Sequence, residues 1–220
     1  MSTARDLARA ALSLPAERAP EQGDLSLALA GAEAADLLKG GALTLVGDVL
    51  VPGPPAMTGD RLLDQAAAAL VRQEPYEKVE DWLWRRGNGL AAAYVDDLGR
   101  AEGIGHATGH GLRARFARHA PADLPVAHPA EEHRGADDPL VGELLAVLRG
   151  VDALPEEADE EAEEKAQDAT ADVAGDGTED PAGDAVATVL AAVGDAVTDL
   201  EALRLRREVE DAAFDNMWRA

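Results

Sequence analysis

The stretch TGDRLLDQA, residues 58–66, carries the signals of a helix that begins abruptly and buries one face. Thr58 can cap the N-terminus of this helix, and Asp60 then falls in the first turn, where the helix dipole favours an acidic side chain. The apolar residues recur at helical spacing and form the predicted buried stripe: Leu62, Leu63, Ala66, Ala67, Leu70 and Val71. The stretch therefore predicts a short amphipathic helix packed on a core.

Further helices are predicted on both sides of this stretch. Asp24 and Gly40 are start and stop signals for a helix over 24–39, and Ser2 or Thr3 can cap a first helix that Pro15 ends. The apolar stripe of the 24–39 helix comprises Leu25, Ala28, Leu29, Ala32, Ala35 and Leu38. Later helices are expected over 79–86, over 90–100, from Asp138 and from about Asp184.

A short β-hairpin is predicted near 43–51, where two β-branched runs flank a Gly-Asp turn. An isolated hairpin with apolar residues needs a covering surface, so its turn is a candidate contact between copies of the chain. The residues predicted to make this contact are Val46, Gly47, Asp48 and Val49.

The composition also favours packed helices. The chain has 220 residues, of which 47 are Ala and only seven are aromatic, so the core must be built from small and branched aliphatic side chains. We therefore predict a mainly α fold, a single helical domain with a projecting short β-hairpin. The predicted organisation is a helical domain over 1–154, a linker over 155–184 and a C-terminal helix over 185–220 that packs back on the domain.

The net charge of −23 is unevenly distributed. Residues 156–184 contain thirteen acidic residues and one Lys, too few apolar groups to offset the entropy of ordering, so this segment is predicted to be a disordered acidic linker. A chain this acidic is repelled by bare phosphate backbones and anionic membranes unless basic residues are locally concentrated.

Several classes of chemistry are disfavoured by the residue types. The chain has no Cys, no apolar run near the ~20 residues of a membrane span, and no secretory leader pattern, which predicts a cytoplasmic location. The glycines of 103–109 do not follow a strand, as a dinucleotide site requires, and His106 and His110 have no clear third ligand. We predict no metal, no cofactor and no enzymatic activity.

One basic cluster stands out. Arg113, Arg115 and Arg118 surround Phe116, an arrangement that can contact an anionic lipid head group with the aromatic ring as an anchor. The alternative is that these arginines form a solvated face that balances nearby acids.

The order of these elements, followed by VEDWL at 79–83, resembles that of bacterial members of the Golgi phosphoprotein 3 family. The resemblance covers roughly 4–104, 139–154 and the last helix. It implies an all-helical domain whose projecting hairpin mediates oligomer contacts. Eukaryotic members are non-enzymatic peripheral adaptors that bind phosphatidylinositol 4-phosphate and hold glycosyltransferases on Golgi membranes.

The residues of the family's head-group pocket do not transfer to this chain. The family uses a Trp before the second helix, an Arg within it and an Arg pair on a later helix. Here the segment 21–24 has no Trp, the expected basic position falls near Ala30, and 90–94 contains no Arg. Trp82, at the family's V-x-x-W position, is predicted to be a core residue packed against the 58–66 helix.

Three functions follow from these observations. The first is a peripheral adaptor at the inner face of the membrane that binds phosphatidylinositol 4-phosphate or another anionic lipid. The second is a cytoplasmic oligomeric scaffold without lipid binding. The third is a winged-helix-like DNA regulator, which is disfavoured because the hairpin has no Arg or Lys and has Asp48 in its turn. No nucleic-acid partner and no transmembrane segment are expected.

Overall fold

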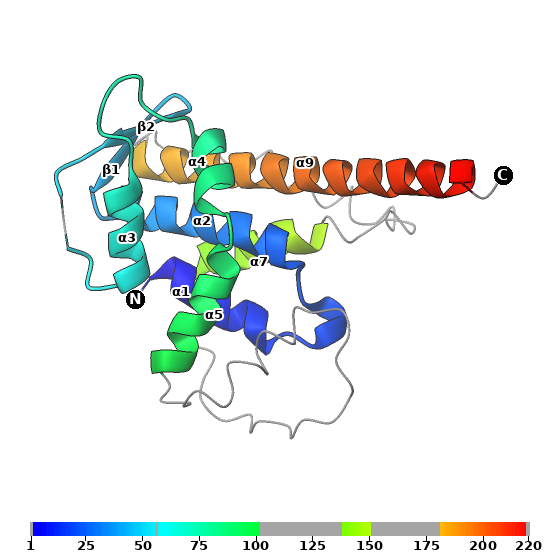
Figure 1. Cartoon of the computed structure of the whole chain (residues 1–220). Helices are drawn as coiled ribbons and strands as arrows, with labels where there is room; N and C mark the ends of the chain where they lie inside the picture. Colours follow the sequence, from blue (N-terminus) through cyan, green and yellow to red (C-terminus); the bar gives the residue numbers. More distant parts are fainter. Residues whose placement is uncertain (1, 56, 102–137, 151–180, 219–220) are drawn as a thin grey trace, which may run out of the picture.

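The computed structural model describes residues 2–55, 57–101, 138–150 and 181–218. It confirms a mainly helical fold with one antiparallel two-stranded hairpin (Figure 1). The elements are α1 (Thr3–Ser13), the 3-10 turn η1 (Ala16–Arg18), α2 (Gln22–Lys39), β1 (Leu43–Val46), β2 (Val49–Pro52), α3 (Arg61–Ala69), α4 (Val79–Arg86), α5 (Leu90–Ala101), α7 (Pro139–Gly150) and α9 (Pro181–Trp218).

Helix α2 is the centre of the fold and is buried on almost every side. The sequence predicted one apolar stripe on this helix, but Leu27, Ala30, Ala34 and Leu37 lie outside that stripe and are buried as well. The single-stripe prediction was too narrow because α1, α5, α7 and α9 all pack around α2. Its many Ala residues allow these neighbours to approach closely.

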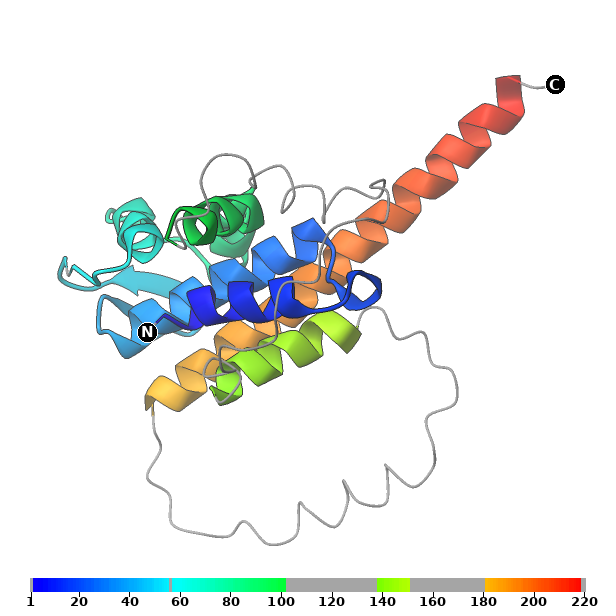
Figure 2. The ribbon, with the colours of Figure 1, turned by 90° about the horizontal axis from the view of Figure 1, so that it is seen from below.

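Glycines on α2 allow α9 to pack along it. A Cβ atom at Gly31 would lie 2.3 Å from Cγ2 of Val193, and one at Gly23 would lie 2.8 Å from Cδ2 of Leu200. A methyl group at Gly31 would have to displace the branched side chain of Val193, whereas at Gly23 the neighbours are the ends of the Leu200 and Arg204 side chains, which can move aside. The first half of α9 is thereby held against the domain, while its second half extends beyond it (Figure 2).

The hairpin is part of the core at its base and exposed at its turn. Leu43 and Leu50 are buried, and the register pairs Val46 with Val49 across the turn. Strand β2 also contacts the segment before α4, because the Leu50 N–H donates to the carbonyl of Glu77 at 2.8 Å. The hairpin is therefore fixed to the domain at its base and projects only at its tip.

Several helix boundaries differ from the prediction. Asp60, not Thr58, caps α3, because its Oδ1 accepts from the amides of Leu62 and Leu63. Helix α3 ends before Leu70, which leaves Val71 exposed. Helix α2 begins at Gln22 with Glu21 as its N-cap residue, and Asp24 contacts Arg204 instead. Helix α9 begins at Pro181, where proline suits the first turn.

The α2–α9 packing generates a matched pair of predictions. Gly31→Ala should destabilise the fold by about 1–3 kcal/mol, because the new methyl group displaces Val193 from a close-packed contact. Gly194→Ala, on α9 with open space around it, should stabilise the fold by up to about 1 kcal/mol through helix propensity. Urea denaturation of both variants checks this. Equal effects of the two substitutions would contradict the close approach.

Candidate functional site

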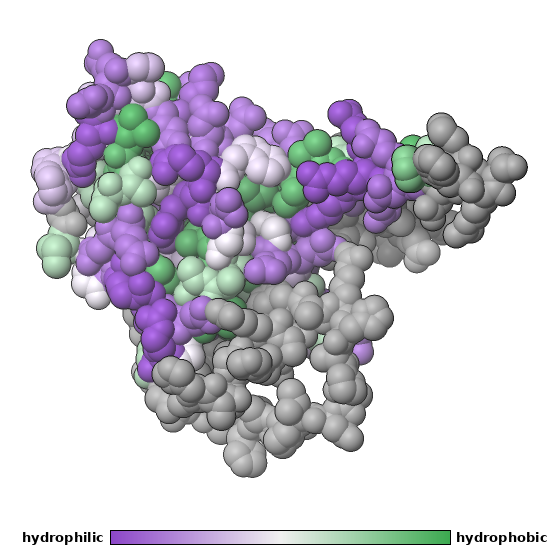
Figure 3. All heavy atoms as spheres, viewed as in Figure 1, coloured by the Kyte–Doolittle hydropathy of each residue, from purple (hydrophilic) through white to green (hydrophobic). Residues whose placement is uncertain are grey.

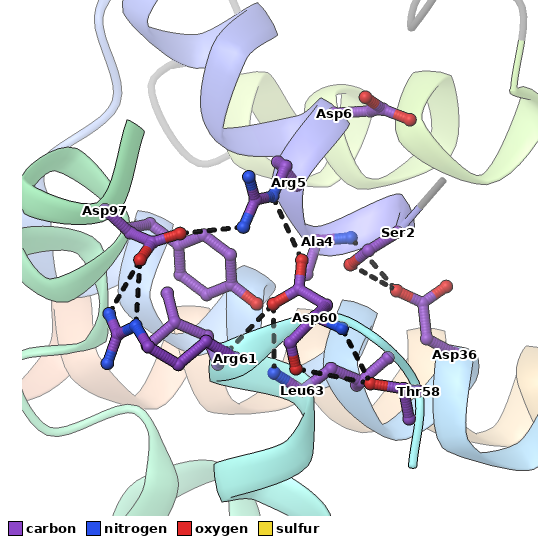
Figure 4. A network of polar contacts seen from close by, with 12 residues as sticks. Ser2, Ala4, Arg5, Asp6, Asp36, Thr58, Asp60, Arg61, Leu63 and Asp97 are labelled. Atoms are coloured by element: carbon purple, nitrogen blue, oxygen red, sulfur yellow. Dashed lines mark hydrogen bonds and ion pairs between the residues drawn. The ribbon is translucent and has the colours of Figure 1, made fainter. Parts of the chain in front are cut away.

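A network of charged side chains joins α1, α3 and α5 (Figure 4). The Arg5 guanidinium donates through Nε to Asp60 Oδ2 at 3.0 Å and through Nη2 to Asp97 Oδ2 at 2.7 Å. Arg61 donates to the other oxygen of Asp97 from Nε at 3.0 Å and Nη2 at 2.8 Å. Asp60 of the TGD motif therefore both caps α3 and links it to α1, which is a structural role.

The start of α1 is fixed by carboxylates from other helices. Ser2 makes no side-chain cap; its hydroxyl donates to Asp36 of α2 at 2.9 Å. Thr3 donates to Asp138 at 3.2 Å, just before α7. In the TGD segment, the Thr58 hydroxyl donates to Asp64 at 2.8 Å. These polar contacts hold the start of α1 and the TGD segment in place.

Glu33 is the most deeply buried carboxylate among the described residues, with a relative exposure of 0%. Arg86 of α4 binds it through two hydrogen bonds, of 2.7 and 2.9 Å, and the Tyr94 hydroxyl of α5 donates to it at 3.0 Å. Burial raises the pKa of Glu33, although Arg86 opposes the shift, and burial also raises the pKa of Tyr94. Because both groups are closed off from solvent, they cannot exchange protons with a substrate.

The predicted core position of Trp82 is confirmed, and its helix, α4, packs on α2 and α9. Its side chain has no exposed surface, and its indole N–H donates to the carbonyl of Ala30 at 3.2 Å. The Arg85 guanidinium lies 5.3 Å from the centre of its ring, and Arg85 is bound to Glu77 by two hydrogen bonds of 2.6 Å. Arg85 and Arg86 are thus both paired with carboxylates of the domain, with Arg86 part-buried and Arg85 exposed.

An open cleft of about 480 Å³ lies between the start of α2, the α4–α5 turn and α9. The cleft adjoins the segment 21–24, where the family resemblance places one part of the head-group pocket, whereas Ala30 and residues 90–94, the other positions of that pocket, do not line it. The lining residues are Gln22, Gly23, Ser26, Leu27, Trp84, Gly87, Asn88, Gly89 and Leu200. None of them is basic.

The cation nearest this cleft is already neutralised. A Cβ at Gly23 would lie 2.8 Å from Nη2 of Arg204, which places this guanidinium at the edge of the cleft. Its Nη1 lies 2.9 Å from Asp24 Oδ2 and 3.2 Å from Glu21 Oε2. One positive charge facing two carboxylates has little remaining capacity to attract a phosphate.

The cleft walls offer apolar and uncharged polar groups. Trp84, Leu27 and Leu200 contribute apolar surface, and Asn88 contributes an amide. The Ser26 hydroxyl donates to the carbonyl of Gln22 at 2.7 Å and accepts from the Ala91 amide at 3.1 Å. Such a surface suits an uncharged ligand group better than an anion.

The residues predicted for lipid contact, Arg113, Arg115, Phe116 and Arg118, lie outside the described residues, as do His106, His110 and the glycines of 103–109. Within the parts of the chain that are described, no cluster of three or more potential metal ligands occurs. No described helix is both long enough and apolar enough to cross a membrane.

The hairpin residues predicted to contact another copy have mixed exposure. Val46 is 63% exposed, whereas Val49 is half-buried and forms an isolated bridge with Lys78. Gly47 adopts a φ of +63°, as the turn requires, and Asp48 forms an ion pair of 2.7 Å with Lys78. The turn therefore presents one large apolar side chain, a small surface for self-association.

Sequence reasoning missed the buried carboxylates. Glu33 lies in the run GAEAAD of the central helix. The one sign of a buried carboxylate in the sequence was that this acidic residue has small apolar residues on both sides. Asp97 follows Asp96 directly in the sequence. Only the folded structure shows that Asp97 is the one of the two that binds Arg5 and Arg61. The arginine partners come from other helices, so no local spacing could have identified them.

Comparison with known proteins gives one positive result. The model of the Golgi phosphoprotein 3 (GPP34) family matches residues 11–193. No curated protein and no solved structure gives a significant match. The family match confirms the resemblance expected from the TGDRLLDQA and VEDWL motifs.

The buried ion pair generates a pH-dependent prediction. Arg86→Met should cost about 3–5 kcal/mol at pH 8, because Glu33 then remains buried without a cation. Loss of Arg86 raises the pKa of Glu33 further, so the deficit should shrink as the pH falls and the carboxyl becomes protonated. Urea denaturation at pH 8 and pH 5 measures this change.

Arg100→Met is the matched control for this experiment. Arg100 is exposed and lies 3.4 Å from Asp97, so its loss should cost less than about 1 kcal/mol. A deficit in Arg86→Met that stays constant between the two pH values would contradict the role assigned to Glu33.

Proposed function

Because the chain belongs to the Golgi phosphoprotein 3 family, we propose that it is a non-enzymatic adaptor that binds its partners through uncharged surfaces and not through a phosphorylated head group. The observation that carries this proposal is the cleft at the start of α2, whose lining contains no basic side chain. Phosphate recognition in proteins depends on Arg, Lys or clustered backbone amides aimed at the anion.

The distribution of arginine supports the same proposal. The arginines closest to the cleft and to the core bind Glu33, Glu77 and Asp24, and the Arg5–Arg61 pair binds Asp60 and Asp97. Each of these arginines is paired with a carboxylate of the same domain, which lowers its capacity to attract an anion. Because the whole chain also carries a net charge of −23, long-range attraction to an anionic surface is absent.

The proposal that the adaptor is not an enzyme is supported by the described polar groups. Glu33 and Tyr94 are closed off from solvent, and Asp60 and Asp97 are held by Arg5. No described nucleophile lies within hydrogen-bond distance of a general base that could activate it in the cleft.

A second candidate function is binding to an anionic lipid at the inner face of the membrane. It is supported by the sequence cluster of Arg113, Arg115 and Arg118 around Phe116. This function would use residues other than those that line the cleft. Self-association through Val46 of the hairpin also stays a prediction.

Co-sedimentation with liposomes separates the two candidates. Vesicles of neutral lipid, of neutral lipid with phosphatidylinositol 4-phosphate, and of neutral lipid with phosphatidylglycerol are compared at low salt. We expect no pelleting above that with neutral vesicles. Pelleting with anionic vesicles that is lost in Arg113→Ala/Arg115→Ala/Arg118→Ala would overturn the proposal in favour of lipid binding.

A gain-of-charge variant tests whether the neutral lining of the cleft is the limiting factor. Gln22→Arg/Asn88→Arg places two bases on the cleft rim, and it should increase pelleting with phosphatidylinositol 4-phosphate vesicles at least several-fold. Gln65→Arg/Gln73→Arg adds the same charge elsewhere on the chain and should have little effect. Equal pelleting by the two variants would show that net charge, and not the cleft, controls binding.

A further inference from the structure

The second half of α9 leaves the domain and continues as a single helix (Figures 1 and 2). Leu200 and Arg204 are the last side chains whose contacts with α2 are described, at Gly23 and Asp24. Beyond them the helix is exposed, with Leu205 56% and Val209 69% accessible. Figure 3 shows apolar residues interrupting the polar surface along this part of α9.

Four of the exposed apolar residues follow a coiled-coil spacing, while Leu203 and Phe214, which are also exposed, lie outside it. Ala202, Leu205, Val209 and Ala212 are separated by three, four and three residues, the pattern of a and d positions in two successive heptads. All four are exposed. A face with this spacing, which we call the α9 seam, is the kind that a second helix covers.

The α9 seam points away from the domain. At 100° per residue, it lies roughly 150° around the helix from Val189, Val193 and Leu200, which face α2. Two copies of α9 could therefore meet along the seam with their domains on opposite outer sides. The domains would not have to separate from α9 for this contact to form.

The charges beside the seam favour a parallel arrangement of identical helices. Glu201 and Glu208 occupy g positions, and Arg206 occupies an e position. In a parallel pair, Glu201 of each copy faces Arg206 of the other, five residues further along. In an antiparallel pair, the g positions of the two helices would face each other, so Glu201 and Glu208 of one copy would face those of the other.

We propose that a second copy of this chain packs in parallel along the α9 seam and forms a short two-stranded coiled coil. Two heptads alone are too short for a stable isolated coil. Here the first half of α9 is already ordered by its packing on α2, so dimerisation does not have to nucleate the helix that continues beyond it. The inference does not depend on what the cleft binds.

The seam face of α9 is apolar only in the projecting half, so the proposed contact is confined to that half. Towards the N-terminus, the seam positions are Thr188, Ala191, Asp195 and Thr198, which are exposed but small or polar. Two of the three hydroxyl and carboxyl residues, Thr188 and Thr198, donate to carbonyls of their own helix. The apolar seam begins where the helix leaves the domain.

Sedimentation equilibrium of the full chain, from about 1 to about 200 µM, tests the proposal. The mass should rise with concentration from 22.9 kDa towards twice that value. Leu205→Asp/Val209→Asp should raise the dissociation constant at least about a hundredfold, because it places four acids in the seam. Both positions are exposed, so circular dichroism should show an unchanged fold. A wild-type chain that stays monomeric, or a dimer that survives this substitution, would overturn the proposal.

Two further variants test the partner surface and the orientation. Val46→Asp changes the hairpin turn and should leave the dissociation constant unchanged; loss of the dimer in this variant would assign self-association to the hairpin. Arg206→Glu should weaken the dimer about tenfold, and adding Glu201→Arg should restore it. A double variant as weak as Arg206→Glu would overturn the parallel arrangement.

Discussion

The structure depends on how a fully buried carboxylate, Glu33 of α2, is neutralised. Desolvation strongly disfavours an isolated charge, so the fold must bring a cation and further donors to it. Arg86 supplies two hydrogen bonds from α4, and Tyr94 supplies one from α5. Because Glu33 and its two partners belong to three different helices, satisfying one side chain fixes the arrangement of α2, α4 and α5. In the same way, Arg5 of α1 pairs with Asp60 at the start of α3 and with Asp97 of α5, and so connects these helices.

This way of building the domain has a consequence for its surface. Arginine is the most common basic residue of the chain. Several of the arginines that the structure describes, including Arg5, Arg86 and Arg204, pair with carboxylates of the same domain. The cleft at the start of α2 is consequently bordered by apolar and amide groups, with its nearest guanidinium, Arg204, held by Glu21 and Asp24. The chain belongs to the family, while the lining of this cleft includes no basic side chain.

The sequence predicted the helices, the hairpin and the family well, because those features have local signals. Helical spacing, the Gly-Asp turn and the TGDRLLDQA motif each act within a few residues. Burial around α2 was harder to predict, since Ala fits both an exposed and a buried face, and the all-round packing depends on Gly31 meeting Val193. The charge network could not be predicted, because Glu33 and Arg86 are 53 residues apart and meet only in the folded chain.

The central claim, that the cleft has no site for a phosphorylated head group, is tested most directly by NMR. Inositol 1,4-bisphosphate is titrated into the 15N-labelled full chain while the indole N–H of Trp84 and the amides of Gly23 and Gly89 are followed, since these groups line the cleft. The account predicts small, linear shifts that do not saturate. Saturable shifts confined to these three groups would contradict it.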